Sequence, residues 1–274
     1  MPSPSLVDTH CHLNFRAYAD DLDAVIKRAA EAGVRQVIVP AIDLDSCGEA
    51  LALSRAYSGL CCALGIHPNS SKEADPAHIE RIRDWSQRDE AVAIGEIGLD
   101  YYWDKSPKHV QIEWFEMQLE LAAERGLPVI IHNREASNDV LDILASWAPN
   151  LPLGLRNRPG VLHSFSGDRA QAERALALGF YLGFTGPLTF KNAGELRDIA
   201  KSAPRDRLLI ETDGPFLTPH PYRGKRNEPG YLPHINDKLA ELHDVSPIEM
   251  ARQTSANADV LFSLSSPRDK TAVN

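Results

Sequence analysis

The sequence predicts an α/β fold, a single-domain (β/α)8 TIM-type barrel, and three observations lead to it. Short apolar runs recur about eight times, longer amphipathic stretches separate them, and the length of 274 residues suits one barrel of roughly 250 residues. Nearly continuous apolar runs are typical of parallel strands that are buried on both faces. A doubly wound open sheet is the structural alternative, and the number and spacing of the strand–helix units favour the closed barrel.

Eight segments have the apolar pattern of strands. They are Leu6–Asp8, Gln36–Val39, Cys61–Ile66, Ala91–Gly95, Pro128–Ile131, Val161–Leu162, Phe180–Phe184 and Leu208–Ile210. Helical patterns between them stop at a glycine, which favours the left-handed conformation at a helix end. The clearest are Asp20–Ala32, Val110–Arg125 and Asp168–Leu178. We therefore expect one barrel domain over residues 1–264 and a polar C-terminal tail over residues 265–274.

Two segments interrupt the alternation of strands and helices. Residues Trp147–Pro159 (WAPNLPLGLRNRP) are rich in Pro, Asn and Gly, which predicts a surface loop before the sixth strand. Residues Thr218–Pro233 (TPHPYRGKRNEPGYLP) predict a long irregular loop after the eighth strand. Loops longer than about 12 residues are usually functional or disordered, so the second loop is a candidate for substrate contact.

Composition limits the classes of function. The chain has 29 Lys+Arg against 38 Asp+Glu and a formal net charge of -9, which argues against broad electrostatic adsorption to nucleic acid or anionic membranes. A nucleic-acid substrate remains compatible with this charge if a metal or a local basic loop supplies the positive field. The 4 cysteines form no CxxC pair, which indicates free thiols in a reducing compartment. Without a secretory signal or an apolar run of roughly 18 residues, we expect a cytoplasmic protein with no membrane contact and no obligate protein partner.

Polar residues follow most of the predicted strands, and they are the informative pattern for function. They are His10, His12, His67, Glu96, His132, His163, Glu211 and Asp213. The C-terminal ends of all barrel strands meet at one face, which is where barrel enzymes carry their active sites. Residues far apart in the sequence are therefore expected to meet in one pocket.

The residue types in this pocket indicate a metal site. His10 and His12 are two positions apart on a strand, so their side chains point the same way and can bind one cation together. Imidazoles suit zinc and similar metals, and carboxylates add negative charge. One strand-end histidine alone is more often structural, but histidines and acids at this many strand ends favour a site for one or two divalent metals. Two metals about 3.5–4 Å apart lower the pKa of a shared water toward neutrality.

Seven motifs occur in order along almost the whole chain. They are DTHCHL at Asp8–Leu13, GIHP at Gly65–Pro68, GEIGLDYY at Gly95–Tyr102, IIHNR at Ile130–Arg134, HSFSG at His163–Gly167, ETDGPFL at Glu211–Leu217 and RGKRNEP at Arg223–Pro229. As a set they resemble the TatD family of metal-dependent deoxyribonucleases, within the amidohydrolase superfamily. Two features depart from that pattern: Gly214 stands where a serine is expected, and the loop at 147–159 is longer than usual.

The resemblance implies a set of metal ligands and two divalent metal ions. The implied ligands are His10, His12, Glu96, His132, His163 and Asp213. Glu96 would bridge the two metals, so no carboxylated lysine is required. Asp213 would accept the proton of the attacking water, which makes Glu96 and Asp213 the expected catalytic residues. Glu211 either orients a ligand or the water, or is a buried partner for a nearby cation, and the metal stays open among Mg, Mn, Zn and Ni.

Substrate contacts are expected from basic residues beside this site. Arg223 and Lys225 lie in the long loop with nearby tyrosines, and basic and aromatic side chains together suit single-stranded nucleic acid. Arg134 and His67 are further candidates for contact with phosphate. The resemblance implies a 3′-5′ exonuclease on single-stranded DNA or RNA. Two alternatives are a metal-dependent deacylase or amidohydrolase acting on an aminoacyl ester or small amide, and a non-catalytic metal-binding interaction protein.

Overall fold

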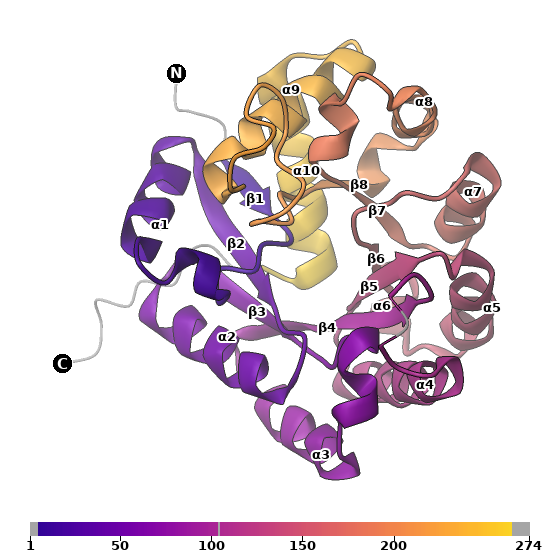
Figure 1. The fold of residues 1–274 in the computed structure, drawn as a ribbon. Coiled ribbons are helices and arrows are strands. Elements are labelled where there is room, and N and C mark those ends of the chain that lie inside the picture. The colour runs from indigo at the N-terminus through magenta and orange to yellow at the C-terminus, as the bar shows by residue number, and fades with distance from the viewer. Residues whose placement is uncertain (1–4, 104, 265–274) are drawn as a thin grey trace.

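Eight parallel strands form one barrel-like sheet in the computed structural model, which describes residues 5–103 and 105–264 (Figure 1). The strands are β1 (Leu6–Asp8), β2 (Val34–Pro40), β3 (Leu60–Leu64), β4 (Ala91–Asp100), β5 (Val129–Arg134), β6 (Gly160–Leu162), β7 (Tyr181–Phe184) and β8 (Leu208–Ile210). Their order in the sheet is β1 to β8, so each strand pairs with its neighbour in sequence. This order confirms the predicted barrel over the doubly wound alternative, and the predicted tail at 265–274 lies outside the described residues.

The two ends of the sheet approach each other just beyond β1 and β8. Cys11 forms a parallel bridge with Gly214, and the amide of His12 donates to the Gly214 carbonyl oxygen at 2.9 Å. The amide of Asp213 donates to the His10 carbonyl oxygen at 2.8 Å. The contacts that bring the sheet ends together therefore involve the segments that carry the predicted metal ligands.

Helices surround the sheet on its outer side (Figure 1). The α-helices are α1 (Leu22–Glu31), α2 (Leu44–Ala56), α3 (Pro76–Trp85), α4 (Lys108–Arg125), α5 (Ser137–Trp147), α6 (Leu153–Arg156), α7 (Arg169–Ala177), α8 (Gly194–Ser202), α9 (Leu232–Leu242) and α10 (Pro247–Phe262). Short 3-10 turns are η1 (Arg16–Tyr18), η2 (Pro68–Glu73), η3 (Ala148–Asn150), η4 (Gly186–Thr189), η5 (Arg205–Arg207) and η6 (Pro229–Tyr231). Over the described part of the chain, none of the helices has the length and apolarity needed to cross a membrane.

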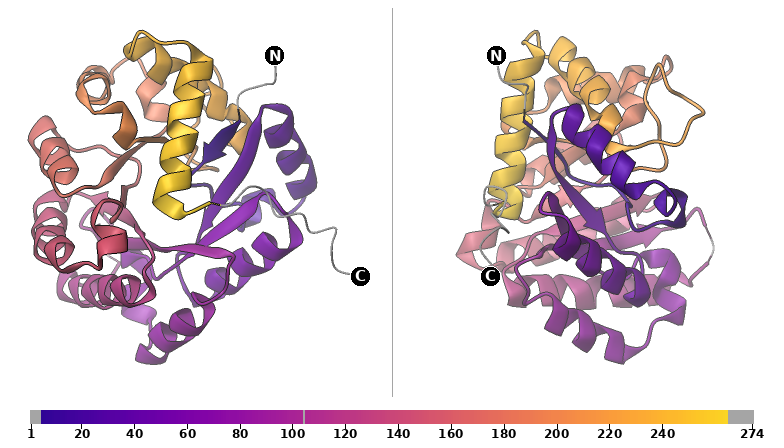
Figure 2. Two further views of the ribbon diagram at one scale, coloured as in Figure 1. Left: turned by 180° about the vertical axis from the view of Figure 1, so that it is seen from behind. Right: turned by 90° about the vertical axis from the view of Figure 1, so that its left-hand side faces the viewer.

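Helix α10 closes one end of the barrel. Seen from behind in Figure 2, it crosses the end of the barrel that faces away from the viewer of Figure 1. Its residues Leu261 and Phe262 join a buried cluster with strand residues such as Val7, Ile38 and Leu209. In the side view of Figure 2, the orange segment after β8 lies on the side opposite α10. The carboxyl ends of the strands therefore form the open end of the barrel, as expected for a barrel enzyme.

Strand β4 is longer than the sequence pattern predicts, because it continues to Asp100 instead of ending at Gly95. Its partner β5 also continues, and the pairs Gly98↔His132 and Asp100↔Arg134 extend the ladder beyond the apolar run. Gly98 makes this approach possible: its φ is 137°, and a Cβ atom there would overlap the carbonyl oxygen of His132. Backbone pairing between β4 and β5 thus fixes the positions of polar residues such as Asp100 and His132.

The segment Trp147–Pro159 was expected to be a surface loop, and this expectation is wrong in part. It contains η3 and α6, and the side chains of Leu151 and Leu155 are buried in the main core. Its prolines do not prevent this, because Pro152 precedes α6, where no helical hydrogen bond from its nitrogen is needed. The segment packs as part of the outer layer.

Candidate metal centre

Four side-chain atoms converge from three parts of the chain: the segments that follow β1 and β8, and the interior of β4. The Nε2 atoms of His10 and His12 lie 3.2 Å apart. Glu96 Oε2 lies 3.4 Å from His10 Nε2 and 3.6 Å from His12 Nε2. Asp213 Oδ1 lies 3.8 Å and 3.7 Å from the same two nitrogens. Tetrahedral zinc with bonds of about 2.0–2.1 Å keeps its ligand atoms about 3.3 Å apart, so this set has the dimensions of a metal cage.

The other oxygen of Glu96 faces a second group of histidines. Glu96 Oε1 lies 2.8 Å from His132 Nδ1 and 3.8 Å from His163 Nε2. His163 Nε2 in turn lies 3.9 Å from Asp213 Oδ1. Both combinations, His10–His12–Glu96 and Glu96–His132–His163, place one donor atom of each residue within 4.8 Å of the others. The two oxygens of one carboxylate therefore face two adjacent ligand groups, which is the arrangement a bridging ligand needs.

The protonation states of His12 and Glu96 suit a divalent cation. Burial, followed by the proximity of His10, holds the pKa of His12 well below its usual value, so its imidazole is neutral. Burial alone would raise the pKa of Glu96, but His10 and His132 outweigh it and hold that pKa well below the usual range. A neutral imidazole and an ionised carboxylate whose donor atoms point at one another are stabilised by a cation between them. The residues present therefore fit a divalent metal.

The carboxylate of Asp213 lies next to this cluster. Burial raises its pKa above that of a free aspartate, and the nearby His163 opposes the rise only in part. Its backbone φ of 55° lies in the left-handed region, and the hydrogen bond from its amide to His10 holds it there. The carboxylate is thus directed into the cluster by a constrained turn directly after β8.

Glu211 contacts His163 directly. His163 Nδ1 donates to Glu211 Oε1 at 3.1 Å, and the amide of Ser164 donates to the same oxygen at 2.6 Å. Thr9 Oγ1 donates to Glu211 Oε2 at 3.1 Å. Burial alone would lower the pKa of His163, but the charge of Glu211 outweighs it and raises this pKa to about 10. The buried carboxylate has room because a Cβ atom at Gly183 on β7 would overlap it.

Asp100 is a site residue that the sequence analysis missed. His132 Nε2 donates to Asp100 Oδ2 at 3.0 Å, and Asn69 Nδ2 donates to the same oxygen at 3.1 Å. Burial alone would raise the pKa of Asp100, but the hydrogen bond from His132 outweighs it and lowers this pKa to about 2. A signal was available in the motif GEIGLDYY, where Asp100 stands four positions after Glu96. The apolar run ends at Gly95, so the sequence pattern alone does not extend β4 to Asp100.

His67 faces the same cluster with a defined tautomer. The amide of Asn69 donates to His67 Nδ1 at 3.0 Å, so in the neutral ring the hydrogen is on Nε2. Burial, with His132 next, lowers the pKa of His67 to about 3, which keeps the ring neutral. His67 Nε2 lies 3.7 Å from Glu96 Oε1. The ring thus presents an N–H donor toward the metal cluster.

The three basic residues of the long loop differ in their contacts. The guanidinium of Arg223 lies 4.0 Å from the centre of the Phe190 ring, and Lys225 Nζ lies 5.3 Å from the centre of the Tyr222 ring. Among the described residues, neither forms an ion pair with an acid, and both side chains are exposed. Arg226, in contrast, donates to both carboxylate oxygens of Asp21 at 2.7 Å. Arg226 therefore anchors the loop to the start of α1, and Arg223 and Lys225 remain available to solvent.

Gly214, the departure from the expected serine, has a steric explanation. A Cβ atom at this position would overlap the hydroxyl of Tyr18 and lie 2.8 Å from Cys11 Sγ. The Tyr18 hydroxyl donates to the Asn227 carbonyl oxygen at 2.6 Å, so it is fixed in that place. The space that a serine side chain would need beside Asp213 is thus occupied by Tyr18 and Cys11.

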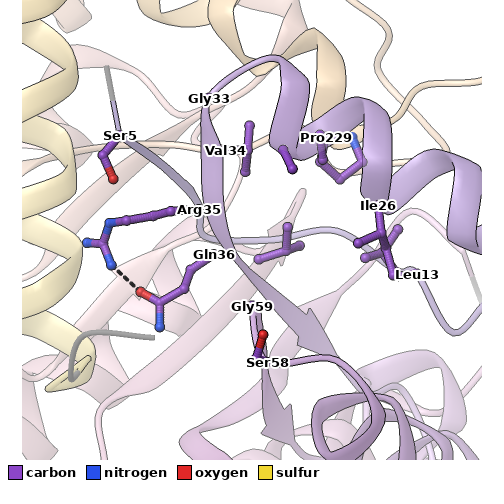
Figure 3. Close-up of a pocket in the computed structure, with 13 residues that line it drawn as sticks. Ser5, Leu13, Ile26, Gly33, Val34, Arg35, Gln36, Ser58, Gly59 and Pro229 are labelled. Atoms are coloured by element: carbon purple, nitrogen blue, oxygen red, sulfur yellow. Dashed lines mark hydrogen bonds between the residues drawn. The ribbon is translucent and has the colours of Figure 1, made fainter. Parts of the chain in front are cut away.

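A cavity of about 440 Å³ lies away from the metal cluster, between α1 and the start of β2 (Figure 3). Its walls include Leu13, Ile26 and Val34, and the side chains of Arg35 and Gln36 contact each other at its edge. None of the predicted site residues lines it. This cavity belongs to the packing of α1 against the barrel and is separate from the cluster.

Barrel topology together with a cluster of histidines and acids at the strand ends defines a metal-dependent hydrolase. A family model described as TatD related DNase matches residues 7–263. The chain belongs to the TatD family.

Three similar proteins illustrate this membership. The chain is 43% identical to the uncharacterized metal-dependent hydrolase YabD of Bacillus subtilis over 257 residues, which cover 94% of this chain and 98% of YabD. It is 38% identical to the 3'-5' ssDNA/RNA exonuclease TatD of Erwinia amylovora over 265 residues, covering 94% of this chain and 100% of that protein. The crystal structure of YJJV, a TatD homolog from Escherichia coli, superposes with a TM-score of 0.89 at 34% identity and covers 96% of this chain and 100% of YJJV.

Proposed function

We propose that this protein is a nuclease that hydrolyses phosphodiester bonds of DNA or RNA as a 3′-5′ exonuclease on single strands. The observation that carries the proposal is the position of Glu96, whose two oxygens face the two histidine groups on either side. Such a pair of cation sites clamps the attacking and leaving oxygens of a phosphodiester. The name of the Erwinia relative supports the choice of substrate.

The ligand groups divide between two divalent cations. His10, His12 and Asp213 would hold the first, His132 and His163 would hold the second, and Glu96 lies between the two groups. When bound, the cations lower the pKa of a water molecule and neutralise charge on the phosphate.

The chain's own residues complete the reaction. Asp213, with its raised pKa, accepts the proton of the attacking water. Glu211 fixes the ring of His163 through Nδ1, which leaves Nε2 directed at the centre. His67 donates its Nε2–H to a phosphate oxygen.

Exposed cations around the open end of the barrel bind the substrate backbone. Arg134, Arg223 and Lys225 are exposed, and among the described residues none of them forms an ion pair with an acid. Free guanidinium and ammonium groups of this kind bind phosphates without reading the base. A cytoplasmic location stays a prediction from the sequence.

The decisive experiment is incubation with end-labelled single- and double-stranded oligonucleotides in Mg²⁺, Mn²⁺ or Zn²⁺, followed by identification of the products. Stepwise release of mononucleotides from the 3′ end is expected, and Asp213→Ala should abolish it while circular dichroism stays that of the wild type. An Asp213→Ala protein with undiminished nuclease activity contradicts the proposal.

The same product analysis separates the alternatives. Release of an amino acid from an aminoacyl ester, without cleavage of the oligonucleotide, indicates the deacylase. No product from either substrate with any of the three metals indicates a non-catalytic binding protein.

A further inference from the structure

Two exposed aromatic groups flank the metal cluster, and the proposed phosphate chemistry does not use them. Tyr102 and Trp103 follow β4, and 49% and 48% of their surfaces are exposed. Phe216 follows β8 and is 52% exposed. Large aromatic side chains lose free energy when they remain in water, so their exposure beside a reactive centre indicates a ligand that covers them.

The first group is tied directly to His132. Asp100, which accepts the hydrogen bond of His132, also accepts hydrogen bonds from the amides of Tyr102 and Trp103, each at 3.0 Å. The two rings meet edge to face, with centres 4.9 Å apart and an angle of 89° between their planes. One carboxylate thus holds the ligand histidine and the backbone of both aromatic residues.

Arg134 adds a positive charge to this first group. Its guanidinium lies 4.0 Å from the centre of the Tyr102 ring and 5.5 Å from that of Trp103. Arg134 follows His132 by two positions on β5, so both project from the same side of the strand. A cation beside exposed rings matches a nucleotide, which has a phosphate next to a flat base.

The second group lies against His12. The Phe15 ring stacks on the His12 ring with centres 4.4 Å apart at an angle of 21°. The Phe216 ring lies 6.4 Å from His12 and 6.2 Å from Phe15, at steep angles to both. This group therefore stands next to the first cation site, whereas Tyr102 and Trp103 stand next to the second.

A phosphodiester joins two nucleosides, so a scissile phosphate at Glu96 extends one base toward each side of the centre. We propose that Trp103 and Phe216 form two base-stacking subsites, one for the nucleoside on each side of the scissile phosphate, with Arg134 on the phosphate next to the Trp103 subsite. This inference rests on the proposed nuclease function. Bases of a duplex are already stacked and paired, so the two subsites also give the protein its preference for single strands.

The test combines protein variants with substrates that lack one base. The test variants are Trp103→Ala and Phe216→Ala. The first control is Trp103→Phe, which keeps a ring. The second control is Leu153→Ala, which removes an 81% exposed apolar side chain from α6. Each enzyme is assayed on an oligothymidylate and on two versions in which the terminal or the penultimate 3′ nucleotide carries a tetrahydrofuran in place of the sugar and base.

On the intact oligonucleotide, each alanine variant at a subsite should lose about tenfold in kcat/KM, mainly through KM, because the stacking of one base is lost. Trp103→Phe should retain most of the activity, and Leu153→Ala all of it. On one of the two abasic substrates, Trp103→Ala should be as active as the wild type, because the base that Trp103 stacks on is absent. On the other abasic substrate, Phe216→Ala should be as active as the wild type for the same reason. Only direct contact between a ring and a base makes the effect of each variant depend on one particular base.

Two results overturn the inference in distinguishable ways. If the wild type cleaves the oligonucleotides but the losses of the variants are the same on intact and abasic substrates, the subsites are wrong and the nuclease function stands. If the wild type cleaves none of them with Mg²⁺, Mn²⁺ or Zn²⁺, the proposed function itself is wrong, and the subsites are overturned with it.

Discussion

His132 Nε2 donates a hydrogen bond of 3.0 Å to Asp100, and the opposite nitrogen of the same ring, Nδ1, lies 2.8 Å from Glu96 Oε1. A ring whose Nε2 hydrogen is held by a carboxylate has its Nδ1 lone pair free for a cation. Carboxylate partners of this kind orient metal-binding histidines and raise their basicity. The relationship places Asp100 in the site as the carboxylate partner of His132.

Replacing Asp100 should weaken the cation site proposed at His132 and His163. We expect Asp100→Asn to lower the affinity of this site for a divalent cation by about 10- to 100-fold, because the His132 ring loses its charged partner. Competition with a chromophoric chelator measures this affinity. Asp139→Asn is the control, since Asp139 is exposed and bonds only to the Tyr101 hydroxyl among the contacts described for it. Equal affinities in wild type and Asp100→Asn would contradict the role.

Restoring a serine at position 214 should destabilise this chain. Gly214→Ser introduces a Cβ atom that overlaps the Tyr18 hydroxyl and crowds Cys11, so we expect a loss of about 1–3 kcal/mol in the free energy of unfolding. Urea denaturation measures the loss. Adding Tyr18→Phe removes the overlapping hydroxyl, and the double variant should be less destabilised than the two single changes added together. If the losses in the free energy of unfolding are strictly additive, the Tyr18 hydroxyl is not what excludes a serine side chain at position 214.

Two arginines three positions apart should respond differently to the same change. Arg226→Ala removes the two hydrogen bonds to Asp21 and should increase proteolytic cleavage within the loop at 218–233. Arg223→Ala removes an exposed side chain that lies over the Phe190 ring and, within residues 5–103 and 105–264, forms no ion pair, so it should leave cleavage unchanged and weaken oligonucleotide binding. Limited proteolysis and fluorescence anisotropy give the two readouts. Identical behaviour of the two variants would refute this division of roles.

The Asp21–Arg226 contact should also give the protein a component of acid sensitivity. The hydrogen bond from Arg226 lowers the pKa of Asp21 below its ordinary value of 3.8. A carboxyl group whose pKa is lower in the folded state stabilises the fold above the unfolded pKa, and this stabilisation is lost as the pH falls through the folded pKa. Asp21→Asn should therefore reduce the urea midpoint at neutral pH, and this midpoint should converge on that of the wild type only as the pH falls through the lowered pKa of Asp21. A difference that is independent of pH would rule out this linkage.

The strand and helix pattern could be predicted because it depends on local sequence. Buried parallel strands need continuous apolar runs, and helices end well at glycines such as Gly126 and Gly179, which adopt φ of 67° and 87°. The convergence of His10, His12 and Asp213 could also be predicted, since a barrel brings all strand ends to one face. Predicting the strands, the helices and this convergence requires only the order of the elements along the chain.

Other features depend on pairing and packing between distant segments. The extension of β4 to Asp100 depends on its ladder with β5, and the burial of Leu155 depends on the core beneath α6. The basic cluster RGKR looks uniform in sequence, but contact with Asp21, 205 residues away, makes Arg226 an anchor.

By itself, then, the sequence determined the barrel and the residue types at its open end, because periodicity and strand order follow from local patterns. Only the tertiary structure decided that Glu96 directs one oxygen to each histidine group, and that Asp100 holds both His132 and the aromatic pair after β4. The physical reason is that hydrogen bonds between side chains require positions accurate to a few tenths of an ångström. Those positions are set by the packing of the whole barrel.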